Sequence, residues 1–127
     1  MDNDFINKVI KTIVHIKAAT VYSLCGLLWA FKTGTAFKQE VCIFLALPII
    51  SSIYSLSGGK IFFLMGCWLL VLACELLNTA IERVCDLITI EHDELVKIIK
   101  DCSSAAVFLT IGANVFLWIW IIITEVE

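Results

Sequence analysis

The chain has 127 residues, of which 61% are hydrophobic and 17% are charged. Soluble domains are about 45–50% apolar and about 25% charged, so this composition excludes an ordinary soluble domain and indicates a small polytopic membrane protein. The formal net charge of −3 and the nine scattered Lys and Arg residues exclude an electrostatic surface for nucleic acid. The six cysteines form no C-x-x-C pair and no Cys/His ligand spacing, which indicates structural thiols.

The first predicted element is an N-terminal helix over about residues 3–32. In residues 5–16, apolar side chains recur with helical period and the lysines lie largely on the opposite face. The next apolar run, residues 18–31, is bounded by Lys17 and Lys32, and its 14 residues would rise only about 21 Å. Because the hydrocarbon core is about 30 Å thick, we expect an amphipathic helix that lies in the membrane interface.

Three membrane helices are predicted to follow, over about residues 38–58, 61–90 and 96–124. The first contains a charge-free run of 19 residues that ends at Gly59, and the serines and glycines at its end predict a turn. The polar residues 89–94 predict a loop before the last helix, which has 23 consecutive uncharged residues. The sequence therefore predicts an all-α membrane protein that forms a single domain over the whole chain.

The basic residues are distributed unevenly between the two sides that this topology creates. The N-terminal segment and the loop between the last two helices share one side, which carries Lys8, Lys11, Lys17, Lys32, Lys38, Arg83, Lys97 and Lys100. The other side holds Lys60 and an acidic tail with Glu125 and Glu127. The positive-inside rule predicts that the N-terminus and residues 75–101 face the cytoplasm.

Polar side chains line one face of the second membrane helix. At about 100° per residue, a narrow stripe contains Glu75, Asn78, Thr79, Glu82 and Asp86. Fourteen uncharged residues precede Glu75, so its carboxylate lies about 21 Å along the helix, close to the lipid–water boundary. An Asp deep in an apolar helix costs about 2.5–3.5 kcal/mol unless it has a partner, so the stripe indicates a functional site. An interhelical polar seam is the structural alternative.

These groups are suited to phosphoryl transfer. Glu75 is placed to take a proton from the hydroxyl of a lipid headgroup. Glu82, two turns closer to water, is placed to hold a hard cation, and Mg²⁺ typically takes one or two carboxylates plus substrate phosphates. Lys100 is a donor that can neutralise a phosphate. A base, a metal and a cationic clamp are the parts that position the reactants in phosphoryl transfer.

The spacing E-x-x-N-T-A-I-E-x-x-x-D, from Glu75 to Asp86, resembles the signature E-x-x-N-[ST]-A-[IV]-E-x-x-x-D of the small bacterial integral-membrane diacylglycerol kinase family. The segment K-D-C-S-S-A-A-V, which begins at Lys100, is similar to the family's K-D-x-[GS]-S-A-A-V. Two N-terminal patches, Y-S-L-C-G from Tyr22 and A-F-K-Q-E ending at Glu40, are similar to its Y-S-x-x-G and A-F-R-Q-E patches.

The resemblance covers about residues 18–118 and implies a homotrimer of three-span protomers in the bacterial inner membrane, with active sites between neighbouring chains. Three spans and the positive-inside rule predict a C-terminus in the periplasm. The resemblance also implies transfer of the γ-phosphate of MgATP to the hydroxyl of diacylglycerol, which gives phosphatidate. Carried over position by position, Glu75 would be the catalytic base and Glu82 a ligand of Mg²⁺. The ATP-binding residues would be Tyr22, Glu82, Glu91, His92, Asp93, Lys100 and Asp101. The lipid substrate would be contacted by Glu75, Asn78 and Ser104.

The chain departs from the family's pattern near its N-terminus. The family usually places a second metal-binding glutamate six residues before the last Glu of A-F-R-Q-E, and this position is Gly34. His15 stands where an arginine is expected, seven residues before Tyr22. Cys25 and Leu28 replace basic residues usual in that region. These changes bear directly on metal affinity and turnover.

Three alternatives remain open. The lipid substrate could be undecaprenol, because related proteins share the core motif. The chain could be a non-catalytic relative in which the acidic stripe only holds the trimer together, an alternative that Gly34 favours. A small proton-coupled transporter would also use an intramembrane glutamate, but only one acid lies deep and no relay continues to the other side.

Overall fold

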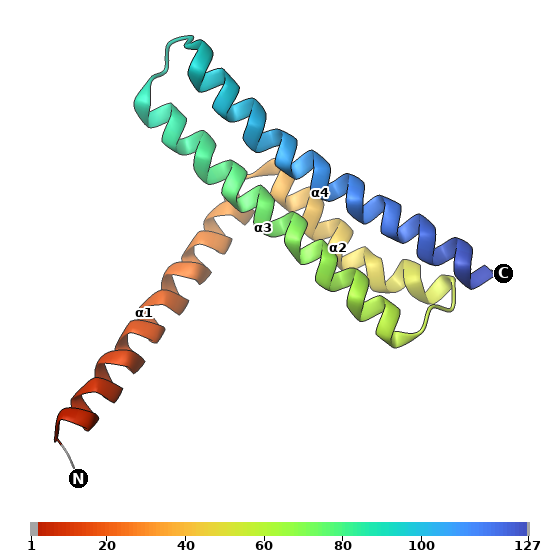
Figure 1. Ribbon diagram of the computed structural model, residues 1–127, viewed down its shortest axis with the longest axis horizontal. Coiled ribbons are helices and arrows are strands. Elements are labelled where there is room, and N and C mark those ends of the chain that lie inside the picture. The colour runs from red at the N-terminus through yellow and green to blue at the C-terminus, as the bar shows by residue number, and fades with distance from the viewer. Residues whose placement is uncertain (1–2, 127) are drawn as a thin grey trace. The chain divides into compact units, whose positions relative to one another are not determined.

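The computed structural model describes residues 3–126, which fold into the helices α1 (Asn3–Thr33), α2 (Thr35–Ile53), α3 (Gly58–Ile88) and α4 (Glu94–Val126) (Figure 1). Each of these helices is long and apolar enough to cross a membrane, judged by length and composition. The predicted all-α fold is thereby confirmed. Residues 1–2 and Glu127, which belongs to the predicted acidic tail, lie outside the described residues.

Helix α1 forms a compact unit by itself. It is a continuous helix of 31 residues, in agreement with the helix predicted over residues 3–32. The hydroxyls of Thr12, Thr20 and Ser23 each donate to the carbonyl four residues earlier, so these polar groups are satisfied within the helix. Because the segment Ile6–Thr33 could also cross a membrane, its location in the interface stays a prediction.

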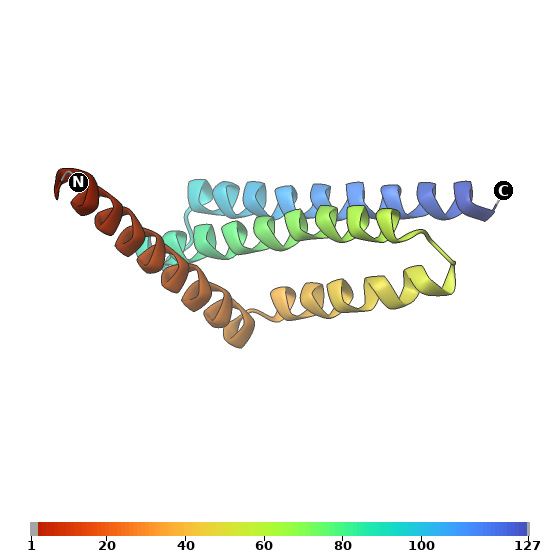
Figure 2. The ribbon, with the colours of Figure 1, turned by 90° about the horizontal axis from the view of Figure 1, so that it is seen from below.

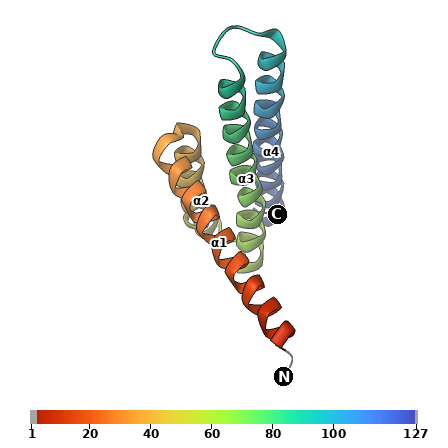
Figure 3. The same ribbon diagram turned by 90° about the vertical axis from the view of Figure 1, so that its left-hand side faces the viewer.

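The second compact unit contains the other three helices. Helix α3 lies between α2 and α4 and packs against both (Figure 2, Figure 3). Helices α3 and α4 run antiparallel as a long hairpin. The centre of this unit is a cluster of buried apolar side chains from α2 and α3, namely Leu47, Trp68 and Val71. This packing fixes the rotation of α3, and with it the direction in which the polar stripe faces.

The connection between α2 and α3 differs from the predicted turn, which extends to Gly59. The chain reverses at Ser55, whose φ of 56° lies in the left-handed region, and the Leu56 N–H donates to the Ser51 carbonyl at 3.1 Å. Gly58 and Gly59 instead form the beginning of α3. The predicted turn is present but shorter than the serine- and glycine-rich stretch, and a serine rather than a glycine adopts the left-handed conformation.

The indole of Trp68 joins α3 to α2. This side chain is 5% exposed, and its Nε1 donates to the Glu40 carbonyl oxygen at 3.0 Å. We expect Trp68→Phe to lower the free energy of unfolding by about 1 kcal/mol, because an intramolecular hydrogen bond contributes about 0.5–1.5 kcal/mol net. Equilibrium unfolding in mixed micelles with increasing SDS measures this loss. The control is Trp120→Phe, since Trp120 is 61% exposed; an equal loss in both variants would contradict the role of this bond.

Candidate active site

The polar stripe of α3 becomes progressively more exposed toward the α3–α4 connection. Glu75 is 6% exposed and Asn78 is 8% exposed, whereas Glu82 is half-buried and Asp86 is exposed. These positions are three or four residues apart, so they follow one face of the helix. The stripe therefore leads from the packed part of the hairpin to its solvent-accessible end.

Asn78 lies at the centre of a hydrogen-bond chain that links α4 to α3. Its Nδ2 donates to Glu82 Oε1 at 3.2 Å, and the Ser103 hydroxyl of α4 donates to its Oδ1 at 2.6 Å. Ser103 is buried, at 9% exposed, whereas the predicted substrate contact Ser104 is exposed. Sequence reasoning missed Ser103 because both serines belong to one cluster of small residues, and only the rotation of α4 decides which one faces α3.

Three carboxylates lie in series along this part of the unit. Glu75 is close enough to Glu40 of α2 and to Glu82 for electrostatic repulsion between the carboxylates. Glu40 is 6% exposed, and its Oε2 is buried with no hydrogen-bond partner. Such a group of buried carboxyls is stabilised either by binding a proton or by a cation nearby.

The donor set fits Mg²⁺ held jointly with a nucleotide. Within residues 3–126, no group of three or more His, Cys, Asp or Glu side chains converges as a complete metal cage. Mg²⁺ does not require one, because it usually binds through one or two carboxylates plus waters and substrate phosphates. The half-buried Glu82 carboxylate, with Oε1 already fixed by Asn78, is suited to this type of binding.

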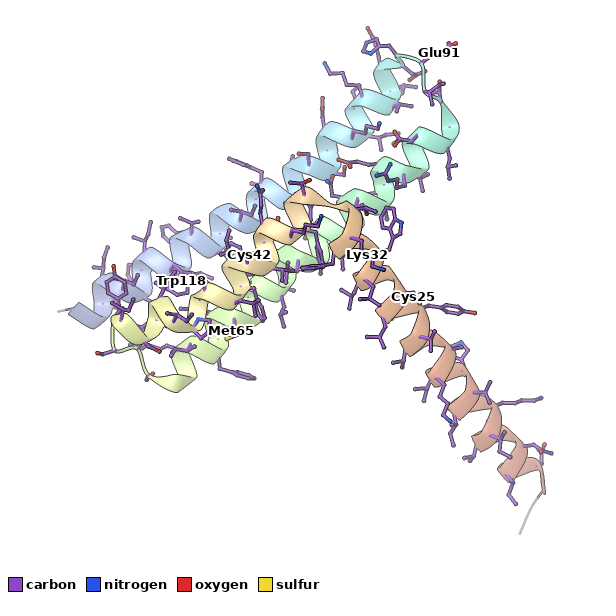
Figure 4. The ribbon with its side chains drawn as sticks, turned by 180° about the vertical axis from the view of Figure 1, so that it is seen from behind. Cys25, Lys32, Cys42, Met65, Glu91 and Trp118 are labelled. Atoms are coloured by element: carbon purple, nitrogen blue, oxygen red, sulfur yellow. The ribbon has the colours of Figure 1, made fainter. Side chains whose placement is uncertain are left out.

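A cleft of about 280 Å³ lies where α3 and α4 are connected; we call it the hairpin-end cleft. It is lined by Asp86, Thr89, Ile90, Glu91, His92, Asp93, Val96, Lys97, Lys100 and Asp101. Figure 4 shows Glu91 at this end of the hairpin and Trp118 toward the other end. Five of the residues predicted to bind ATP therefore line one cleft. Tyr22, a sixth, belongs to α1 and hence to the other compact unit.

Asp93 has a structural role at the cleft. Its Oδ1 accepts hydrogen bonds from the backbone N–H groups of Leu95 and Val96, at 2.8 and 3.1 Å. This is the geometry of an N-cap, so Asp93 fixes the beginning of α4. The predicted loop over residues 89–94 is confirmed up to this cap, because α4 begins at Glu94.

Lys100 forms an ion pair with Asp86 across the hairpin. Its Nζ lies 2.7 Å from Asp86 Oδ1, while Arg83 lies 3.6 Å from Asp86 Oδ2. Because the side chains of Lys100 and Asp86 are 38% and 46% exposed, water and salt screen the attraction and the pair is weak. Lys100 can therefore exchange Asp86 for a phosphate oxygen in the cleft at little cost.

Long apolar helices, an acidic stripe that is buried at Glu75 and exposed at Asp86, and an adjoining cleft with a lysine are the features of a multi-pass membrane protein suited to phosphoryl transfer. The family model of prokaryotic diacylglycerol kinase matches residues 21–122. A diacylglycerol kinase of Haemophilus influenzae is 41% identical over 108 residues, which cover 84% of this chain and 90% of that protein. For the diacylglycerol kinase of Pseudomonas aeruginosa the identity is 36% over 109 residues, covering 86% and 89%.

The diacylglycerol kinase of Escherichia coli K12 is 38% identical over 103 residues, which cover 81% of this chain and 84% of that protein. The chain belongs to the prokaryotic diacylglycerol kinase family. This membership confirms the predicted family and the predicted class of enzyme, a lipid kinase.

Proposed function

We propose that this chain transfers the γ-phosphate of ATP to the hydroxyl of diacylglycerol, which yields phosphatidate and ADP. The observation that carries the proposal is the continuous polar face from the buried Glu75 to the hairpin-end cleft. It joins the buried Glu75 carboxylate, which we assign to the lipid hydroxyl, to a solvent-accessible cleft, which we assign to the nucleotide.

In this mechanism Glu75 takes the proton of the lipid hydroxyl. The hydroxyl oxygen forms a bond to the γ-phosphorus, and the bond from that phosphorus to the bridging oxygen of ADP breaks. Lys100 leaves Asp86 and neutralises negative charge on the phosphates, since its present ion pair is weak. The proton stays on Glu75 until the product leaves.

Glu82 would hold Mg²⁺ together with phosphate oxygens of the nucleotide. When bound, the ion neutralises phosphate charge and orients the γ-phosphate. Asn78 keeps one oxygen of Glu82 in place, and Glu91, His92 and Asp101 line the cleft for the rest of the nucleotide.

The same proposal includes a homotrimer in the bacterial inner membrane, with the N-terminus and active site in the cytoplasm and the C-terminus in the periplasm. Support comes from the distribution of basic residues and from the large apolar side chains that the second unit exposes, among them Phe62 (82%), Leu87 (86%) and Phe108 (75%). Such surfaces require lipid or another chain as cover. The homotrimer is carried over from the family that this chain resembles.

Phosphate transfer from labelled ATP by the purified full chain in mixed micelles tests the proposed function. We expect label to appear in phosphatidate when diacylglycerol is supplied. Transfer to undecaprenol but not to diacylglycerol would favour the alternative lipid. Absence of transfer to either lipid, by protein that remains folded and oligomeric, would identify a non-catalytic relative.

Gly34 offers a test of the metal site. Its backbone, with φ −84° and ψ 118°, is extended and accepts any residue, and it precedes α2 without a side-chain cap. We expect Gly34→Glu to lower the half-saturating Mg²⁺ concentration about three- to tenfold, because added ligand charge strengthens binding of a hard cation. The control Thr35→Glu adds the same charge one position later. A half-saturating concentration for wild type no higher than for Gly34→Glu would contradict the expectation.

A further inference from the structure

The hydrogen-bond chain through Asn78 has a defined polarity. An ionised carboxylate such as that of Glu82 can only accept hydrogen bonds. The group of Asn78 that faces it must therefore be the NH₂ group, which donates. The amide oxygen of Asn78 then faces Ser103, whose hydroxyl must donate. Each of the three groups therefore determines the orientation of the next one, beginning at Ser103.

The single proton of the Ser103 hydroxyl has two acceptors within reach. One is Asn78 Oδ1 at 2.6 Å, and the other is the Lys100 carbonyl oxygen at 2.9 Å. The Lys100 carbonyl lies within α4, where the helix backbone can satisfy it. The buried Asn78 oxygen has no such backbone donor, so leaving it unsatisfied would be costly. The shorter distance and the cost of an unsatisfied Asn78 oxygen both indicate that the Ser103 hydroxyl donates its proton to Asn78 Oδ1.

We infer that Ser103 is a positioning residue for the metal ligand Glu82, and that it acts through the Asn78 amide. The hydroxyl holds the amide so that Nδ2 fixes Glu82 Oε1 and leaves Oε2 available to a cation. Without this hydroxyl, the amide can turn its oxygen toward the carboxylate, which repels it. The inference rests on the proposed function, because that proposal makes Glu82 a metal ligand.

The position of Ser103 gives this interaction a further consequence. Ser103 lies three residues after Lys100, so one turn of α4 carries both the phosphate clamp and the group that orients the metal ligand. A small rotation of α4 therefore changes both groups together.

The test compares Ser103→Ala and Ser103→Thr with wild type in the full-length protein. Mn²⁺ binding is measured by the EPR signal of the free ion in the presence of a non-hydrolysable ATP analogue, and Mg²⁺ dependence is measured by phosphate transfer. We expect the half-saturating concentrations of both ions to rise about three- to tenfold in Ser103→Ala, which is less than the roughly 10–100-fold cost of losing a direct partner of a ligand, because Ser103 acts through Asn78. Ser103→Thr keeps the hydroxyl and is expected to stay within twofold of wild type.

Two further variants keep the test decisive. Thr110→Val removes the hydroxyl of a half-buried α4 residue that bonds to its own helix backbone, so it controls for general loss of a hydroxyl from this helix. Ser103→Cys preserves the side-chain volume with a weaker donor and replaces Ser103→Ala if that variant does not fold.

Unchanged Mn²⁺ and Mg²⁺ half-saturation in Ser103→Ala, or in Ser103→Cys, would overturn the inference, as would an equal change in Thr110→Val. A wild-type protein that neither transfers phosphate nor binds Mn²⁺ would instead refute the proposed function. The two failures are therefore distinguishable in one set of measurements.

Discussion

Glu75→Gln is expected to lower the rate of phosphate transfer by at least about 100-fold, because a positioned general base typically contributes about 10²–10⁴-fold. Glutamine has nearly the shape of glutamate but cannot accept the hydroxyl proton. Removing this charge also removes its repulsion with Glu40 and Glu82, so we expect the free energy of unfolding to stay equal or to rise. Steady-state transfer from labelled ATP and unfolding in SDS mixed micelles measure the two effects.

The matched control for this variant is Glu94→Gln, which makes the same chemical change at an exposed glutamate at the beginning of α4. Its transfer rate is expected to stay within about twofold of wild type, because exposed surface substitutions have small effects. Retention of more than a tenth of the wild-type rate in Glu75→Gln would show that Glu75 is not the base. Loss of the oligomer in that variant would point to the interhelical polar seam.

Lys100→Met is expected to reduce kcat/KM for ATP by about 100-fold or more, because removing one donor that stabilises developing charge costs about 10²–10³-fold. Methionine keeps the apolar stem and removes the charge. Asp86→Asn, by contrast, removes only a weak exposed partner of Lys100 and is expected to change kcat/KM less than about fivefold. Initial rates at varied ATP concentration separate the two variants.

Lys60→Met serves as the control for Lys100→Met, since Lys60 lies at the beginning of α3 and the cleft lies at the end of that helix. It removes the same charge from the same chain. If Asp86→Asn were as impaired as Lys100→Met, the pair would be a structural unit of the active protein. The view that Lys100 exchanges Asp86 for a phosphate would then be wrong.

The helices were predictable because the sequence separates long uncharged runs from short polar stretches. The loop before α4 follows from its polar residues and from Asp93, a residue type that commonly caps helices. The turn after α2 was less predictable, because glycines are the usual residues in the left-handed conformation, yet Ser55 adopts it here. Residue propensities describe which backbone conformation a residue adopts without strain, and tertiary packing can impose a different conformation.

The site was predictable along α3 but not across helices. Helical spacing alone places Glu75, Asn78 and Glu82 on one face, and the structure has them there. Spacing within one helix contains no information on how α4 is rotated, so it could not choose between Ser103 and its neighbour. The burial of Glu40 likewise depends on packing between α2 and α3, which includes the bond from Trp68.

The length of the α3–α4 hairpin links catalysis to the physical state of the bilayer. Helix α3 has 31 residues and is about 46 Å long, about 16 Å more than the hydrocarbon core. The cleft end of the hairpin therefore projects beyond the acyl chains, and the depth of Glu75 depends on how thick those chains make the membrane. Longer acyl chains draw this carboxylate below the headgroups, and shorter ones raise it or tilt the helix. On the proposed role of Glu75 as the base, we therefore expect turnover to depend on hydrophobic mismatch, so that bilayer thickness acts on the rate.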